Sequence, residues 1–87
     1  MGASTDGRVC VAGLDAIGGL PELMTNFSVA TAQRAVRWCE EEDADSVMVI
    51  VMAGRAEAFV GALGLKPGGC NEAVMRQRLA ALLAALA

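Results

Sequence analysis

The sequence predicts an α+β fold in which two short strands carry three or four helices on one face. Two apolar segments rich in valine, at about 8–13 and 46–53, are typical of strands in length and β-branched content. Longer segments with apolar residues three and four positions apart indicate helices. Because 87 residues suffice for one domain only, we expect a single small domain over residues 8–87.

The N-terminal quarter divides into three segments. Residues 1–7 are small and polar, which predicts a flexible N-terminus. Residues 8–13 place valine on either side of a cysteine and end in glycine, so they form the first predicted strand. Residues 14–24 contain two adjacent glycines and a proline, which are typical of a short helical turn or a loop.

Residues 28–43 predict an amphipathic helix. Ser28 is a preferred residue type for capping its N-terminus. The residues expected to form one apolar stripe are Val29, Ala32, Val36 and Cys39.

Residues 46–53 are the most apolar segment and predict a buried central strand. Periodicity alone does not separate such a segment from a buried helix. The alternative is therefore an all-α bundle in which residues 44–63 are helical.

Two further helices are predicted in the C-terminal half. Residues 54–64 place four apolar side chains on one face and end at Gly64; these side chains are Ala56, Phe59, Val60 and Leu63. Asn71 can cap a final helix over residues 72–86. Four of its apolar residues are spaced by four, three and four, which is typical of the seam between two helices; they are Met75, Leu79, Leu82 and Leu86.

The order of these elements suggests an internal duplication. Residues 9–13 resemble residues 50–54, and a short and then a longer helical segment follows each, so the chain is a possible β-α-α duplication. Two strands alone are marginally stable in water. Pairing with a second copy would complete such a sheet, so this fold favours a homodimer.

Composition also favours association. Apolar residues make up 55% of the chain, which is more than a domain of this size readily buries.

The net charge is −3 and no cluster of basic residues is present, so nucleic acid is an unlikely partner. The acidic run Glu40, Glu41, Glu42 and Asp43 is a candidate surface for a basic protein partner, or simply a solvated helix end. No segment is long and apolar enough to predict a membrane span, so we expect a cytoplasmic protein.

The residues offer little catalytic chemistry. The absence of histidine excludes Ser-His-Asp and Cys-His catalysis. Cys70 follows two glycines at a predicted helix start, where a thiolate would be stabilised, or it is a small residue that anchors the helix. Arg55 follows the apolar segment and could hold an anionic ligand. The cysteine spacings match no usual zinc pattern, so neither a metal nor a cofactor is predicted.

These observations favour a non-enzymatic protein-interaction module, such as a small regulator, adaptor or inhibitor, that acts as a homodimer. The alternative is a small-ligand binding domain or minor enzyme with a pocket near Arg55 and Cys70.

Overall fold

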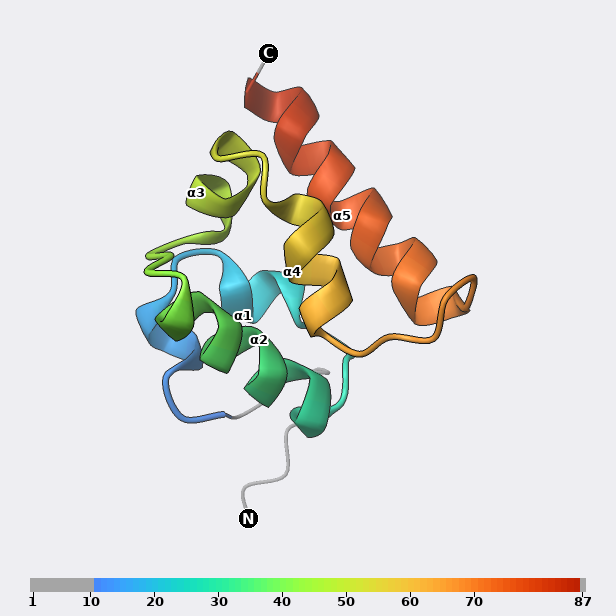
Figure 1. Cartoon of the computed structure of the whole chain (residues 1–87), viewed down its shortest axis with the longest axis horizontal. Coiled ribbons are helices and arrows are strands. Elements are labelled where there is room, and N and C mark those ends of the chain that lie inside the picture. The colour runs from blue at the N-terminus through green and yellow to red at the C-terminus, as the bar shows by residue number, and fades with distance from the viewer. Residues whose placement is uncertain (1–10, 87) are drawn as a thin grey trace.

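The computed structural model describes residues 11–86, and within that range every regular element is a helix. A 3₁₀ turn, η1, and five α-helices follow one another along the chain (Figure 1). Their bounds are η1 Leu14–Ala16, α1 Leu20–Leu23, α2 Val29–Glu41, α3 Val47–Met52, α4 Ala56–Ala62 and α5 Cys70–Leu86.

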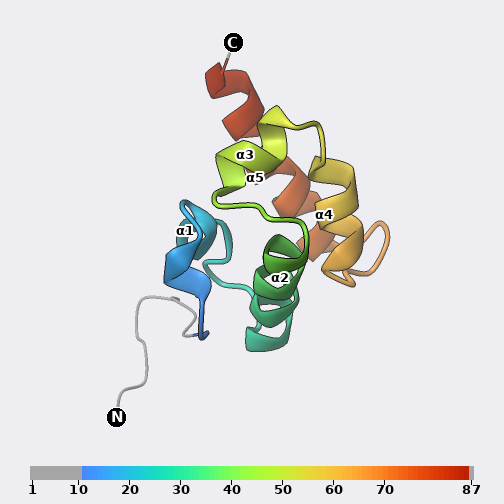
Figure 2. The same cartoon turned by 60° about the vertical axis from the view of Figure 1, so that its left-hand side comes forward.

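Helix α4 lies at the centre of the packing. It contacts α2 on one side and α5 on the other, while α3 also packs against α5 and η1 packs against both α1 and α2. Figures 1 and 2 show α5 running along one side of the molecule, with its C-terminal half beside α3. The core is one continuous cluster, and its largest fully buried side chains include Phe59, Leu63, Leu20, Met24 and Met75.

The predicted α+β fold is wrong. Residues 46–53 form α3, not a central strand, and residues 11–13 of the first predicted strand form a turn; residues 8–10 lie outside the described range. The Ser46 hydroxyl accepts a hydrogen bond from the backbone N–H of Val49 at 3.2 Å, which caps α3. A helix buries Val47, Ile50 and Val51 together, whereas a strand would leave one apolar face without cover.

One trace of strand pairing remains. Gly18 and Ser46 form an isolated parallel bridge, in which Gly18 N–H donates to Asp45 at 3.0 Å and Val47 N–H donates to Gly18 at 2.8 Å. A Cβ at position 18 would lie 3.2 Å from that of Ser46, so glycine permits this close approach. The bridge joins the two segments without forming a sheet. The predicted duplication of a strand unit is therefore wrong in residues 11–86 as well.

The helical alternative is closer to the structure, although residues 44–63 are not one helix. The chain breaks between α3 and α4 at Gly54, which has a φ of 72°. This left-handed conformation suits glycine and ends the first of the two helices. The break lets α3 turn toward α5 while α4 enters the centre of the core.

Helix α2 agrees closely with its prediction. The Ser28 hydroxyl accepts a hydrogen bond from Thr31 N–H at 3.1 Å, which confirms the expected N-cap. Ala32, Val36 and Cys39 are buried, but Val29 is half exposed. The buried face also includes Thr31 and Ala35, so it is rotated away from Val29 relative to the predicted stripe.

Helix α4 is shorter than the predicted 54–64, and its Ala56 is only partly buried, while α5 starts two residues before the predicted 72. Gly64, with a φ of 69°, follows α4, and Phe59, Val60 and Leu63 are buried as predicted. Helix α5 begins at Cys70, ahead of the predicted cap Asn71, because Gly69 C=O already accepts a hydrogen bond from Ala73 N–H at 3.1 Å. The predicted flexible segment 1–7 lies outside the described residues.

Candidate functional site

Arg55, predicted as an anion-binding residue, is exposed and contacts two side chains at the end of α2. Its Nη2 atom lies 2.9 Å from a carboxylate oxygen of Glu42, and its guanidinium group stands 5.8 Å from the centroid of the Trp38 ring. Trp38 in turn meets Phe59 edge to face at 5.4 Å. This chain of contacts joins the end of α2 to the start of α4, so Arg55 has a structural partner where the sequence suggested a ligand.

The acidic run lies on the surface at the end of α2, and part of it stops the helix. Asp43 has a left-handed φ of 57°, and Ala44 N–H reaches back to Cys39 C=O at 2.8 Å. This is the hydrogen-bond pattern of a Schellman C-cap, with aspartate in the position that usually holds glycine. Glu42 pairs with Arg55, which leaves the side chains of Glu40, Glu41 and Asp43 without an ion pair among the described residues. The run remains a predicted surface for a basic partner.

The two cysteines that the structure describes have opposite environments. Cys39 is buried in α2, and burial, followed by the charge of Glu40, raises the pKa of its thiol from 9.0 to about 11. Cys70 is exposed at the start of α5. Arg55 and Cys70 belong to different surroundings, since Arg55 contacts Glu42 and Trp38 at the opposite end of α4 from the Cys70 loop (Figure 1). Within residues 11–86, no group of three acidic or cysteine side chains is arranged to hold a metal ion.

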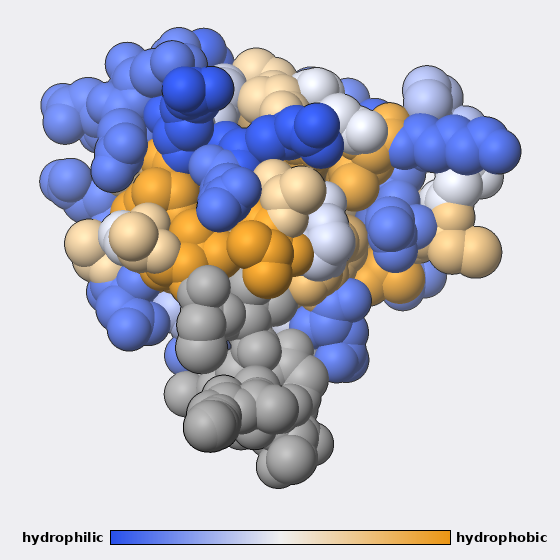
Figure 3. All heavy atoms as spheres, turned by 90° about the horizontal axis from the view of Figure 1, so that it is seen from below, coloured by the Kyte–Doolittle hydropathy of each residue, from blue (hydrophilic) through white to orange (hydrophobic). Residues whose placement is uncertain are grey.

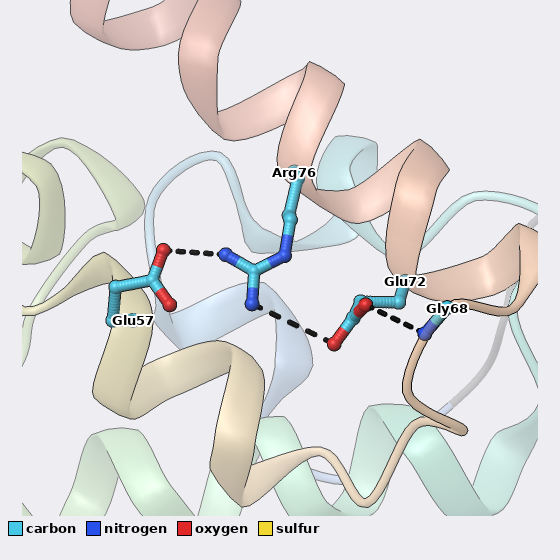
Figure 4. Close-up of polar contacts among 4 residues, drawn as sticks. All are labelled: Glu57, Gly68, Glu72 and Arg76. Atoms are coloured by element: carbon cyan, nitrogen blue, oxygen red, sulfur yellow. Dashed lines mark hydrogen bonds and ion pairs between the residues drawn. The ribbon is translucent and has the colours of Figure 1, made fainter.

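A polar network fastens α5 to its neighbours (Figure 4). The Arg76 guanidinium donates to Glu57 of α4 and lies 3.5 Å from Glu72 one turn earlier on α5. Glu72 also accepts a hydrogen bond from Gly68 N–H at 3.0 Å, which closes the loop before α5. The hydrogen bond with Glu57 is the main reason that the pKa of Arg76 is raised. One guanidinium group is shared by two carboxylates, so the network positions α5 and offers no unpaired cation to an anionic ligand.

Exposed apolar side chains occur on more than one face of the molecule. Figure 3 shows apolar surface in the middle of the face seen from below, with polar side chains along its upper edge. In the part of the chain that the structure describes, the large exposed apolar side chains lie mainly on α3 and on the last turns of α5. They are Val49, Met52, Leu83 and Leu86, with Val29 and Val74 elsewhere.

The predicted seam of α5 is used along only half of its length. Met75 and Leu79 are 0% and 4% exposed, whereas Leu82 is only partly buried and Leu86 is 43% exposed. Leu83, beside the seam, is 58% exposed. The helix therefore carries its apolar face beyond the elements that it packs against.

Helix α3 supplies the rest of this surface. Its inner residues are buried, but Val49 and Met52 point outward, and Met52 is 67% exposed. Val51 of α3 and Leu83 of α5 line one shallow hollow. We call the four residues Val49, Met52, Leu83 and Leu86 the open apolar end. The spacing of apolar residues in α5 predicted part of this surface. The contribution of α3 was not predicted, because residues 46–53 were assigned to a strand.

Comparisons with known proteins assign this chain to no family. No family model matches the chain, and neither a curated protein nor a solved structure is significantly similar to it. Among the described residues, no helix is both long and apolar enough to cross a membrane.

Proposed function

We propose that this chain is a non-enzymatic protein-interaction module that acts as a homodimer, and that the open apolar end is its contact surface. The observation that carries the proposal is the loss of burial along a single apolar face of α5, from Met75 to Leu86. An exposed group of large apolar side chains at one place commonly marks an interaction site.

A second copy suits this surface for a geometric reason. The same face of α5 that packs inside the molecule continues outside it, so two such ends can pack against each other about a two-fold axis. In that arrangement each copy supplies both the ridge of Leu83 and Leu86 and the outward side chains of α3.

Sedimentation velocity over a wide concentration range tests the proposal. The wild-type chain should shift from monomer to dimer, and the double variant Leu83→Glu, Leu86→Glu should remain monomeric. Both substitutions replace exposed side chains, so the monomer should still fold, and circular dichroism checks this.

Val74→Glu is the matched control. Val74 is also an exposed apolar residue of α5, but it lies nine residues before Leu83, about half a turn away around the helix. The control should dimerise like the wild type. A wild-type chain that stays monomeric at high concentration would refute the proposal, and so would equal disruption by Val74→Glu.

A further inference from the structure

A second apolar surface lies beside the seam of α5 and includes its residue Leu82. A groove of about 560 Å³ runs between α1, the start of α3 and the middle of α5. Its apolar side chains come from all three helices, and they are Leu23, Val47, Met48, Ala81 and Leu82. The volume falls within the range of small-molecule sites, and nothing else in residues 11–86 fills the groove.

Two charged side chains border this apolar groove, and they differ in how firmly they are held. Arg78 is partly buried, and its Nη1 atom donates to the backbone carbonyls of Leu23 at 2.7 Å and Thr25 at 2.9 Å. Its guanidinium group also stands 5.3 Å from the centroid of the Phe27 ring. Glu22, by contrast, is exposed on α1. The guanidinium group of Arg78 is therefore fixed in place, and the carboxylate of Glu22 is free to turn toward water.

The contacts of Arg78 leave part of the group available. No carboxylate among the described residues lies within 4.0 Å of it, and its Nε and Nη2 hydrogens have no acceptor there. Those two nitrogens form one edge of the planar guanidinium, an edge that can hold a carboxylate through two hydrogen bonds. Because Nη1 is already anchored, binding an anion here costs little additional side-chain entropy.

We propose that this groove binds a single-chain amphiphile with a carboxylate head, of the fatty-acid type. The alkyl chain lies against Leu23, Met48 and Leu82, and the carboxylate pairs with the Nε and Nη2 edge of Arg78. The apolar wall provides the burial and Arg78 provides the charge complementarity. None of the four residues of the open apolar end lines this groove, so the site does not require dimerisation.

The charge of Glu22 determines whether its removal should strengthen or weaken binding. Its negative charge at the border of the groove opposes a carboxylate, so Glu22→Gln should strengthen binding of the amphiphile by about two- to fivefold. A cationic amphiphile, or a second copy that offers its own arginine to Glu22, would instead be weakened by the same change. The direction of this effect distinguishes the proposed ligand from both.

Calorimetric titration with monomeric dodecanoate tests the proposal, with both the wild type and the Leu83→Glu, Leu86→Glu variant as host. Arg78→Gln should weaken binding by about tenfold or more, and Arg78→Lys by less, because lysine keeps the charge but not the paired donors. Ala81→Trp should abolish binding by filling the groove, while Ala84→Trp, which lines no part of it, should not.

Arg78 also fastens the α1 segment to α5, so its substitution affects stability as well as binding. Ala81 and Ala84 are exposed, so the two tryptophan variants test the groove without that complication. Dodecanoate binding that is unaffected by Ala81→Trp would overturn the proposal. Weaker binding in Glu22→Gln, or tighter binding of dodecyltrimethylammonium than of dodecanoate, would overturn it too. A monomeric wild type that binds dodecanoate would refute the dimer and leave this site standing.

Discussion

The part of the molecule formed by α2 and α4, which we call the closed end, and the open apolar end differ in how well their apolar side chains are buried. Around α4 the apolar side chains close on one another, and Phe59, Leu20 and Met24 are fully enclosed. Around the last turns of α5 and the outer side of α3, residues of the same kind face solvent. Four of the six large exposed apolar side chains therefore lie on α3 and on the last turns of α5, while Val29 and Val74 lie elsewhere.

Helix lengths explain this difference. Helix α5 has 17 residues and spans about 26 Å, while α3 and α4 have 6 and 7 residues and span about 9 and 11 Å. Helices α3 and α4 both pack against α5, with α3 beside its C-terminal half, yet Leu83 and Leu86 near its end remain exposed. A helix that is apolar beyond its last neighbour needs another surface to bury that face.

The largest contrast between the ends should appear at Phe59 and Met52. Phe59→Ala removes a fully buried ring from the centre of α4 and should cost about 3–5 kcal/mol of unfolding free energy. Met52→Ala at the open end should change it by less than about 0.5 kcal/mol in dilute solution. Urea denaturation measures both. Similar losses would mean that the two ends are equally packed.

A finer contrast lies within α5. Leu79→Ala should destabilise the monomer by about 2–5 kcal/mol, because Leu79 is buried against α3 and α4. Leu83→Ala, one turn later, should cost less than about 1 kcal/mol at concentrations where the chain is monomeric. The comparison fails if Leu83→Ala proves as costly there as Leu79→Ala.

The closed end should also respond to alkaline pH through Cys39. Below pH 9 its thiol is protonated in both the folded and the unfolded chain. Between pH 9 and about 11 only the unfolded chain loses the proton, so stability should fall by up to about 2–3 kcal/mol as pH rises through this window. Denaturation midpoints across that range measure the fall. Cys39→Ala should flatten it, and an unchanged slope would contradict the buried thiol.

The smallest expected effect concerns the ion pair at the surface of the closed end. Arg55 and Glu42 are both well exposed, so their coupling in a double-mutant cycle should be about 0.2–1 kcal/mol and should weaken in salt. Truncating Arg55 should cost somewhat more than the coupling, since its contact with Trp38 is also lost. A coupling well above this range would show that the pair is shielded from solvent.

Local signals predicted much of the helical structure. The Ser28 cap, the stop at Gly64 and the buried face of α4 were readable because each depends on residues close in sequence. The fold class was not, since a short valine-rich segment is compatible with a strand or a helix until its neighbours are known. Residues 46–53 became helical because no strand lies alongside them in residues 11–86 and the buried positions suit a helix.

The candidate sites were less predictable. The pairing of Arg55 with Glu42 joins residues that had been assigned to two different predicted sites, and it depends on how α2 meets α4. The role of Arg78 depends on two carbonyls more than fifty residues away in sequence. By contrast, the spacing of Leu79, Leu82 and Leu86 already indicated a helix contact; the structure shows that only its first part is satisfied within one copy.

Amide hydrogen exchange measured at several protein concentrations reports whether a second copy covers the last turns of α5. If a second copy covers the open apolar end, the amides of residues 80–86 should become more protected as concentration rises, while those of α4 should not change. Protection of residues 80–86 that is the same at every concentration would contradict the account.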